Sequence, residues 1–205
     1  QLNRFLTNII RFLMIVFVSL LVWDGLSKYA VRHFCSYEME KKYEAIILGH
    51  SQTEHALDDQ YLPGVKNLCN GGEAYLYTYQ KLKLITAANP QIKTVYLSVA
   101  PNQLTAKLDE WAIDTKNVNS YFSKYAFMME VSDYQLVASH NFEALLNAEI
   151  VAIKNNAKAA VKRQNRVSNG DLGGYMAAQV SKLDSLEQQH HLDKEDFQQF
   201  TKPSV

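Results

Sequence analysis

The sequence lacks an excess of charge of either sign, because 21 basic residues balance 21 acidic ones among its 205 residues. It also has no concentrated basic stripe, so we expect no nucleic acid among its partners. Cysteine is scarce: Cys35 and Cys69 form neither a Cys-x-x-Cys pair nor a metal-ligand spacing. Two cysteines are too few for a disulfide framework, and we expect Cys69 to be a small buried residue.

Signatures of cofactor binding are missing as well. The sequence contains no Gly-x-Gly-x-x-Gly motif, no phosphate-binding loop and no cluster of metal ligands. We therefore expect no cofactor and no metal ion. The length of 205 residues is enough for one domain with an adequate core plus an extra element.

A long apolar stretch is present near the start of the chain. From Phe12 to Trp23 every residue except Ser19 is strongly apolar, and apolar residues continue on both sides. A helix of about 30 residues here would cross a bilayer of roughly 30 Å and emerge beyond it. Arg4 and Arg11 lie on the amino side, which predicts that this side is cytoplasmic.

No small-residue cleavage site of the Ala-x-Ala kind follows the apolar stretch. The sequence therefore predicts an uncleaved membrane anchor over residues 1–34 and a globular part over residues 35–205 outside the cytoplasm. The alternative is a long amphipathic helix buried in the core of a globular domain.

A short apolar block is followed by a serine in a polar turn. Residues 45–48 form a continuous apolar run, which predicts a strand buried on both faces in a parallel sheet. Gly49 permits a sharp turn, and Ser51 falls where the next helix begins, a suitable position for a nucleophile. Ser51 and Glu54 also have the spacing of a capping box, in which the serine hydroxyl accepts from the N–H of Glu54. The two interpretations are compatible.

Two further predicted strands also end in a polar residue or a glycine pair. The strand Val65 to Cys69 leads into Asn70-Gly71-Gly72, where paired glycines bring backbone N–H groups close to a crevice. A helix over residues 73–88, with apolar residues at roughly helical spacing, ends at Asn89-Pro90. The strand Ile92 to Val99 follows and leads to Asn102.

This βαβ order predicts an α/β fold with a parallel sheet. In such sheets, ligands bind beyond the carboxyl ends of the strands, where the strand order reverses. If the order is 2-1-3, then Ser51, Gly71 or Gly72, and Asn102 converge on one crevice. That convergence predicts an acyl-transfer site.

The second half of the sequence, about residues 104–205, predicts a helical insertion or extension. The aromatic segment Trp111 to Phe127 is a candidate lid or insertion. Residues Asn141 to Arg163 predict an alanine-rich amphipathic helix. We expect the basic residues around its end, including Arg166, to be solvated, and Ser168 to Gly174 to be a flexible turn.

Three segments together resemble the opening blocks of the SGNH/GDSL hydrolase superfamily: Ile47 to Ser51, Asn67 to Gly72 and Ser98 to Asn102. With the apolar stretch, they look most like the membrane-anchored extracytoplasmic branch found beside membrane-bound O-acyltransferases. The resemblance implies a flavodoxin-like, three-layer fold. It also implies a single pass through the bacterial inner membrane, with the globular part in the periplasm.

The resemblance assigns roles to individual residues. Ser51 matches the family nucleophile, and Gly72, with Gly71 as the alternative, matches the glycine whose N–H helps to hold the oxyanion. Asn102 matches the asparagine that adds a side-chain donor. These roles imply an esterase or O-acyltransferase that acts on a cell-envelope polysaccharide through a serine acyl-enzyme, with a membrane-bound O-acyltransferase as a possible partner.

Two features depart from the family pattern. His50 stands where the family usually has aspartate, and no Asp-x-x-His occurs in the sequence to supply the general base. His190 and His191 follow Glu187 in a Glu-x-x-His spacing, but no pattern connects them with the crevice. Either the sequence stops before the strand that carries the histidine, or the domain works by binding. The second option is a non-catalytic accessory or structural subunit of a membrane acyltransferase or envelope complex.

Overall fold

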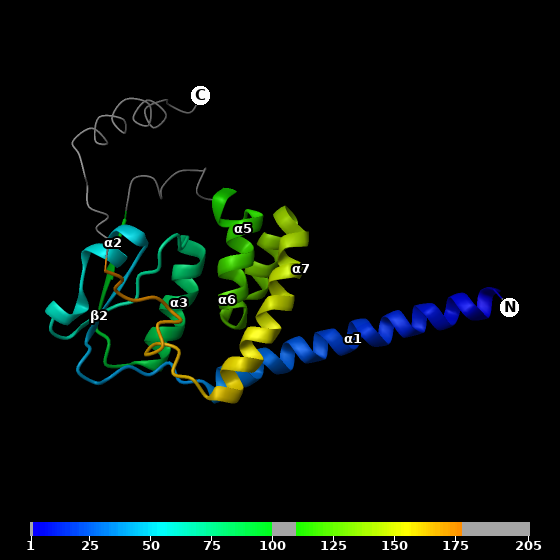
Figure 1. Ribbon diagram of the computed structural model, residues 1–205, viewed down its shortest axis with the longest axis horizontal. Coiled ribbons are helices and arrows are strands. Elements are labelled where there is room, and N and C mark those ends of the chain that lie inside the picture. Colours follow the sequence, from blue (N-terminus) through cyan, green and yellow to red (C-terminus); the bar gives the residue numbers. More distant parts are fainter. Residues whose placement is uncertain (1, 100–109, 178–205) are drawn as a thin grey trace, which may run out of the picture.

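The structure, a computed structural model, describes residues 2–99 and 110–177. Figure 1 shows a long N-terminal helix, α1, that projects from a globular part. Within the globular part a small sheet lies on one side, and a group of helices lies on the side from which α1 projects (Figure 1).

Helix α1 spans Leu2–Phe34. In the part of the chain that the structure describes, it is the one helix long and apolar enough to cross a membrane, with a mean hydropathy of 2.3 over its most apolar 18-residue window. None of that window is buried inside the globular part. The alternative of a buried core helix is therefore wrong, and an apolar helix of membrane-spanning length is confirmed.

The sheet has three strands, β1 (Ala45–Leu48), β2 (Val65–Asn67) and β3 (Thr94–Leu97). All neighbours are parallel, in the order β2-β1-β3. This confirms the predicted parallel sheet and the 2-1-3 order. All four residues of the central strand β1 are buried, as the apolar run predicts.

Helix α3 (Tyr75–Ala88) lies between the sheet and the helical group (Figure 1). Its rings meet those of the helical group, with the Tyr77 and Tyr125 ring centroids 6.0 Å apart. Within α3, Tyr77, Lys81 and Ile85 are buried, whereas Tyr79 is exposed.

The segment 111–128 forms a series of short helical elements: α5 (Thr115–Asn117), the π-helix η3 (Val118–Phe122), α6 (Ser123–Tyr125) and the 3₁₀ helix η4 (Ala126–Met128). The expectation of a lid is wrong for this segment, because Phe122, Tyr125 and Phe127 have no solvent exposure and belong to the core.

Helix α7 (Val131–Lys162) is broken at Asn141, where φ is −151° and ψ is 70°. The side chain of Asn141 accepts from the N–H of Ala144 at 3.2 Å, so the second segment begins with a capping residue where the sequence predicts a helix start. Helices α1 and α7 are joined by the Lys28 Nζ–Glu149 Oε2 ion pair at 2.8 Å.

The chain after α7 differs from the sequence-based expectation. Arg166 is buried and pairs with Asp171 at 2.7 Å, so it is not solvated. Leu172 has no exposure, and a Cβ on Gly173 would lie 2.3 Å from the carbonyl oxygen of Cys69. Residues 172–174 are therefore packed against the segment that follows β2, whereas Ser168, Asn169 and Gly170 form an exposed part of the predicted turn.

Candidate functional site

The carboxyl ends of the three strands are tied together by the backbone. The N–H of Ser98 donates to the Leu48 carbonyl at 2.8 Å, and the N–H of Asn70 donates to the Gly49 carbonyl at 3.0 Å. Gly49 must lack a side chain, since a Cβ there would lie 2.4 Å from Ser98 Cβ. The segments that follow all three strands thus begin at one edge of the sheet.

Helix α2 (Ser51–Ala56) follows β1 directly, and its N-cap is His50. His50 Nδ1 accepts from the N–H of Gln52 at 3.4 Å, and the N–H of Glu54 donates to the His50 carbonyl. The predicted capping box is therefore wrong, because the capping position lies one residue before Ser51. Ser51 occupies the first turn, and its hydroxyl forms no hydrogen bond within residues 2–99 and 110–177.

His50 takes the position where the resemblance implies an aspartate. Its ring is buried, and burial lowers its pKa, so the ring is neutral at pH 7. Since Nδ1 accepts the helix N–H, the ring hydrogen lies on Nε2. Nε2 is buried and has no partner among the described residues. His50 therefore acts as a neutral capping residue.

Gly71 lies directly beside Ser51. A Cβ on Gly71 would be 3.5 Å from Ser51 Cβ and 2.7 Å from Glu54 Oε2. The Gly71 carbonyl is held by the hydroxyl of Tyr121, which donates to it. The sheet thus brings Ser51 and the glycine pair together, as the 2-1-3 order predicts.

Gly72 faces a different set of side chains. Its φ is +72°, a conformation that favours glycine, and a Cβ would lie 2.7 Å from Tyr121 Oη and 3.3 Å from the Trp111 ring. Of the two glycines, Gly71 is therefore the one shown in contact with Ser51.

The backbone at this site has free hydrogen-bond donors. Across the described ranges, the N–H groups of Ser51, Gly71 and Gly72 donate no hydrogen bond. Free amide groups are the kind of donor that stabilises a developing oxyanion when they point toward it. Asn102, the third predicted donor, lies outside the described residues.

His55 is the histidine closest in sequence to Ser51 on the same helix. Its Nδ1 donates to the Met176 carbonyl at 2.7 Å, and its Nε2 lies 3.9 Å from Glu54 Oε2. This arrangement orients the ring toward the buried Glu54 carboxylate, and no described histidine bonds to Ser51 Oγ. His190 and His191 lie outside the described residues.

A buried ion pair lies next to the Gly71–Gly72 turn. Lys81 and Glu73 have fully buried side chains, and Lys81 Nζ lies 2.8 Å from Glu73 Oε1. Lys81 also donates to the carbonyls of Leu68 at 2.6 Å and Leu172 at 3.0 Å. One lysine of α3 therefore contacts the residue after β2, a residue just before α3 and the segment after α7.

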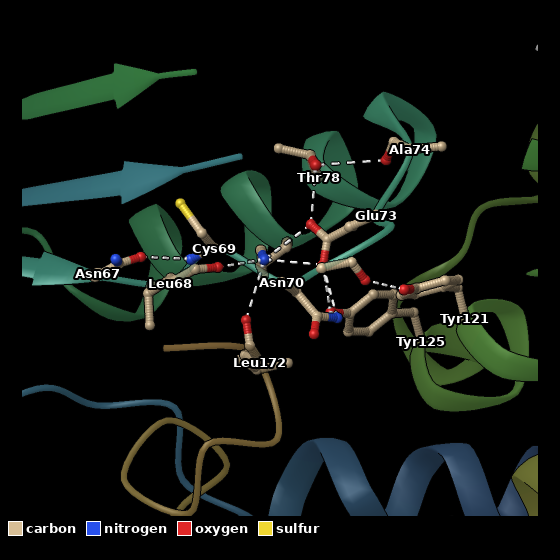
Figure 2. A network of polar contacts seen from close by, with 12 residues as sticks. Asn67, Leu68, Cys69, Asn70, Glu73, Ala74, Thr78, Tyr121, Tyr125 and Leu172 are labelled. Atoms are coloured by element: carbon tan, nitrogen blue, oxygen red, sulfur yellow. Dashed lines mark hydrogen bonds and ion pairs between the residues drawn. The ribbon is translucent and has the colours of Figure 1, made fainter. Parts of the chain in front are cut away.

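Glu73 is the centre of this network (Figure 2). Its carboxylate accepts from Tyr125 Oη at 2.6 Å, from Thr78 Oγ1 at 2.9 Å and from Asn70 Nδ2 at 3.3 Å. Burial and the Glu73 charge raise the pKa of Tyr125 well above its usual value, so Tyr125 remains a donor. Each buried charge thus has several partners, as a stable buried pair requires.

Sequence reasoning missed this network. Glu73 lies before α3 and Lys81 within it, so helical spacing does not predict that they pair. Tyr125 and Leu172 come from distant segments and carry no sequence signal either. Cys35 and Cys69 are both free and buried, as expected for Cys69. Among the described residues, no group of three or more possible ligands could hold a metal ion.

Comparison of the chain with family models, with curated proteins and with solved structures found no match.

Proposed function

We propose that this chain is a membrane-anchored, extracytoplasmic esterase or O-acyltransferase of the SGNH type. It acts on a cell-envelope polysaccharide through a serine acyl-enzyme, and Ser51 is the nucleophile. A flavodoxin-like three-layer fold, an anchor in the bacterial inner membrane and a periplasmic globular part belong to the same proposal. A membrane-bound O-acyltransferase would be the partner that supplies the acyl group.

The observation that carries the proposal is the contact between Ser51 and the Gly71–Gly72 turn at the carboxyl edge of the sheet. Within the described residues the Ser51 hydroxyl forms no hydrogen bond, and the N–H groups of Ser51 and of the adjacent Gly71 donate none. This combination supports acyl transfer because it offers a nucleophile and oxyanion donors in one place.

In the proposed reaction, Ser51 Oγ attacks the ester carbonyl carbon while its proton passes to a general base. The carbonyl electron pair moves onto oxygen, where the N–H groups of Gly71 or Gly72 and the Asn102 side chain stabilise it. The ester C–O bond then breaks, the alcohol leaves with a proton, and an acyl-serine remains. Water or a sugar hydroxyl attacks that ester and regenerates Ser51.

The test is the transfer or release of acyl groups from an acylated polysaccharide by membranes that contain the full chain. Ser51→Ala should lower the rate by at least about 10³-fold, the loss typical of removing a serine nucleophile. Ser139→Ala is the matched control, since Ser139 is exposed and its hydroxyl lies 3.0 Å from His140 Nδ1. Unchanged activity in a folded Ser51→Ala protein would exclude the mechanism.

One observation favours a second candidate, a non-catalytic accessory or structural subunit of a membrane acyltransferase or envelope complex. No described histidine bonds to Ser51, and the ring of His50 serves as a helix cap. A serine without a base is a poor nucleophile. This candidate predicts that Ser51→Ala retains function in cells, whereas the enzyme predicts loss of function with normal protein levels.

A further inference from the structure

A groove lies between the last third of α1 and the end of α7. It has a volume of about 440 Å³, and most of its lining side chains are apolar. Trp23 and Phe34 mark its two ends along α1, and the small side chains of Ala157 and Ala160 leave room on the α7 side. Arg163 contributes the one cation of the lining.

The groove has an apolar end and a charged end, arranged along α1. Trp23 closes the most apolar part of the helix, and Phe34 lies 11 residues later, about 16 Å further along the helix axis. The ends of α1 and α7 are joined, because the N–H of Ser36 donates to the Gln164 carbonyl at 3.0 Å. Arg163 is therefore at the Phe34 end, away from the apolar half of α1 that projects beyond α7 (Figure 1).

The cation at that end has no partner among the residues that the structure describes. Arg163 is exposed and forms no ion pair or side-chain hydrogen bond in the ranges that the structure describes. It follows Lys162 at the carboxyl end of α7, so the positive charge there is reinforced. An apolar path that leads from the bilayer side to a free guanidinium matches an amphiphile with an anionic head and an acyl chain.

We propose that this groove binds one anionic phospholipid of the bilayer that holds α1. The acyl chain lies along the apolar walls between Trp23 and Phe34, and the phosphate pairs with Arg163. The inference rests on the membrane anchoring that is part of the proposed function. An apolar helix from a second copy fits less well, because it would cover Arg163 without offering the guanidinium an acceptor.

The experiment uses the full chain, purified in detergent and titrated with phosphatidylglycerol or phosphatidylcholine, with bound lipid counted by native mass spectrometry. Ala157→Phe fills the groove, and Arg163→Gln removes the charge. Lys154→Gln is the matched control, because Lys154 is an exposed cation of α7 that does not line the groove. Circular dichroism verifies that each variant is folded.

We expect one retained phosphatidylglycerol per chain. Ala157→Phe should weaken both lipids by at least about tenfold, and Arg163→Gln should weaken only phosphatidylglycerol by about tenfold, the equivalent of one charge-assisted contact. Lys154→Gln should change neither lipid. Equal lipid binding by all variants would overturn the proposal, as would a lipid-free dimer that Ala157→Phe dissociates.

The two proposals fail in different ways. Carbonate extraction of the parent protein tests the anchoring, and its release from the membrane would remove the basis of this inference. Reaction of Ser51 with a fluorophosphonate in the same detergent preparations tests the serine site. If the protein stays in the membrane and Ser51 is labelled, but no variant changes lipid selectivity, then the lipid site alone is overturned.

Discussion

Lys81→Met should strongly destabilise the described part of the globular domain. The substitution keeps the length of the side chain but leaves the Glu73 carboxylate buried without its cation. Removing one partner of a buried ion pair costs about 3–5 kcal/mol. Since domains are stable by only about 5–15 kcal/mol, the loss is a large part of the total. For a chain of this size it corresponds to a fall of about 6–20 °C in melting temperature.

The assay is thermal unfolding of the detergent-solubilised full chain, followed by circular dichroism. Lys83→Met is the matched control on the same helix, because Lys83 pairs with Glu130 at 2.5 Å with 34% and 60% of the two side chains exposed. Such a pair contributes about 0–1 kcal/mol. The double variant Glu73→Gln/Lys81→Met should be more stable than Lys81→Met alone. Equal melting temperatures for Lys81→Met and Lys83→Met would refute the reasoning.

Three further predictions concern the same site. Gly71→Ala should weaken fluorophosphonate labelling of Ser51, because its Cβ would lie 3.5 Å from Ser51 Cβ and would displace the Glu54 carboxylate, 2.7 Å away. Gly174→Ala, whose Cβ would lie 4.0 Å from its nearest neighbour, should leave the labelling unchanged. Burial lowers the pKa of His50 below its usual 6.5, so the unfolded chain binds the proton first. The free energy of unfolding should therefore fall as pH drops below about 6.5. His50→Asn keeps a capping side chain and should reduce that fall, as measured by melting curves at a series of pH values. Equal slopes of melting temperature against pH for the two proteins would contradict this. Burial raises the pKa of the Cys69 thiol to about 12, so maleimide should react with it only in denaturant; rapid reaction of the folded protein would count against the structure.

Local patterns in the sequence predicted the framework of the sheet. The apolar run at 45–48 becomes the buried central strand, and the glycine pair and Ser51 meet because parallel strands end at one edge. Asn141 was predicted as a helix start and caps the second segment of α7. Each of these features has its signal in a short stretch of the sequence.

The features that were predicted wrongly or missed depend on partners distant in sequence, or on which of two neighbouring residues caps a helix. Ser51 and His50 can both cap α2, and the structure uses His50, which moves the helix start by one residue. The sequence analysis gave no role to Lys81, which lies in the interior and donates to the carbonyl groups of Leu68 and Leu172. The spacing of apolar residues along a helix does not reveal a buried lysine whose partners lie outside that helix.

The most direct test of the central claim is labelling of the full chain in native membranes with a fluorophosphonate, followed by mass spectrometry of its peptides. The account predicts covalent labelling at Ser51, with no label on the exposed Ser139 and none after heat denaturation. A folded, membrane-inserted protein that takes no label at Ser51 would contradict it, and the accessory role would then be the better account.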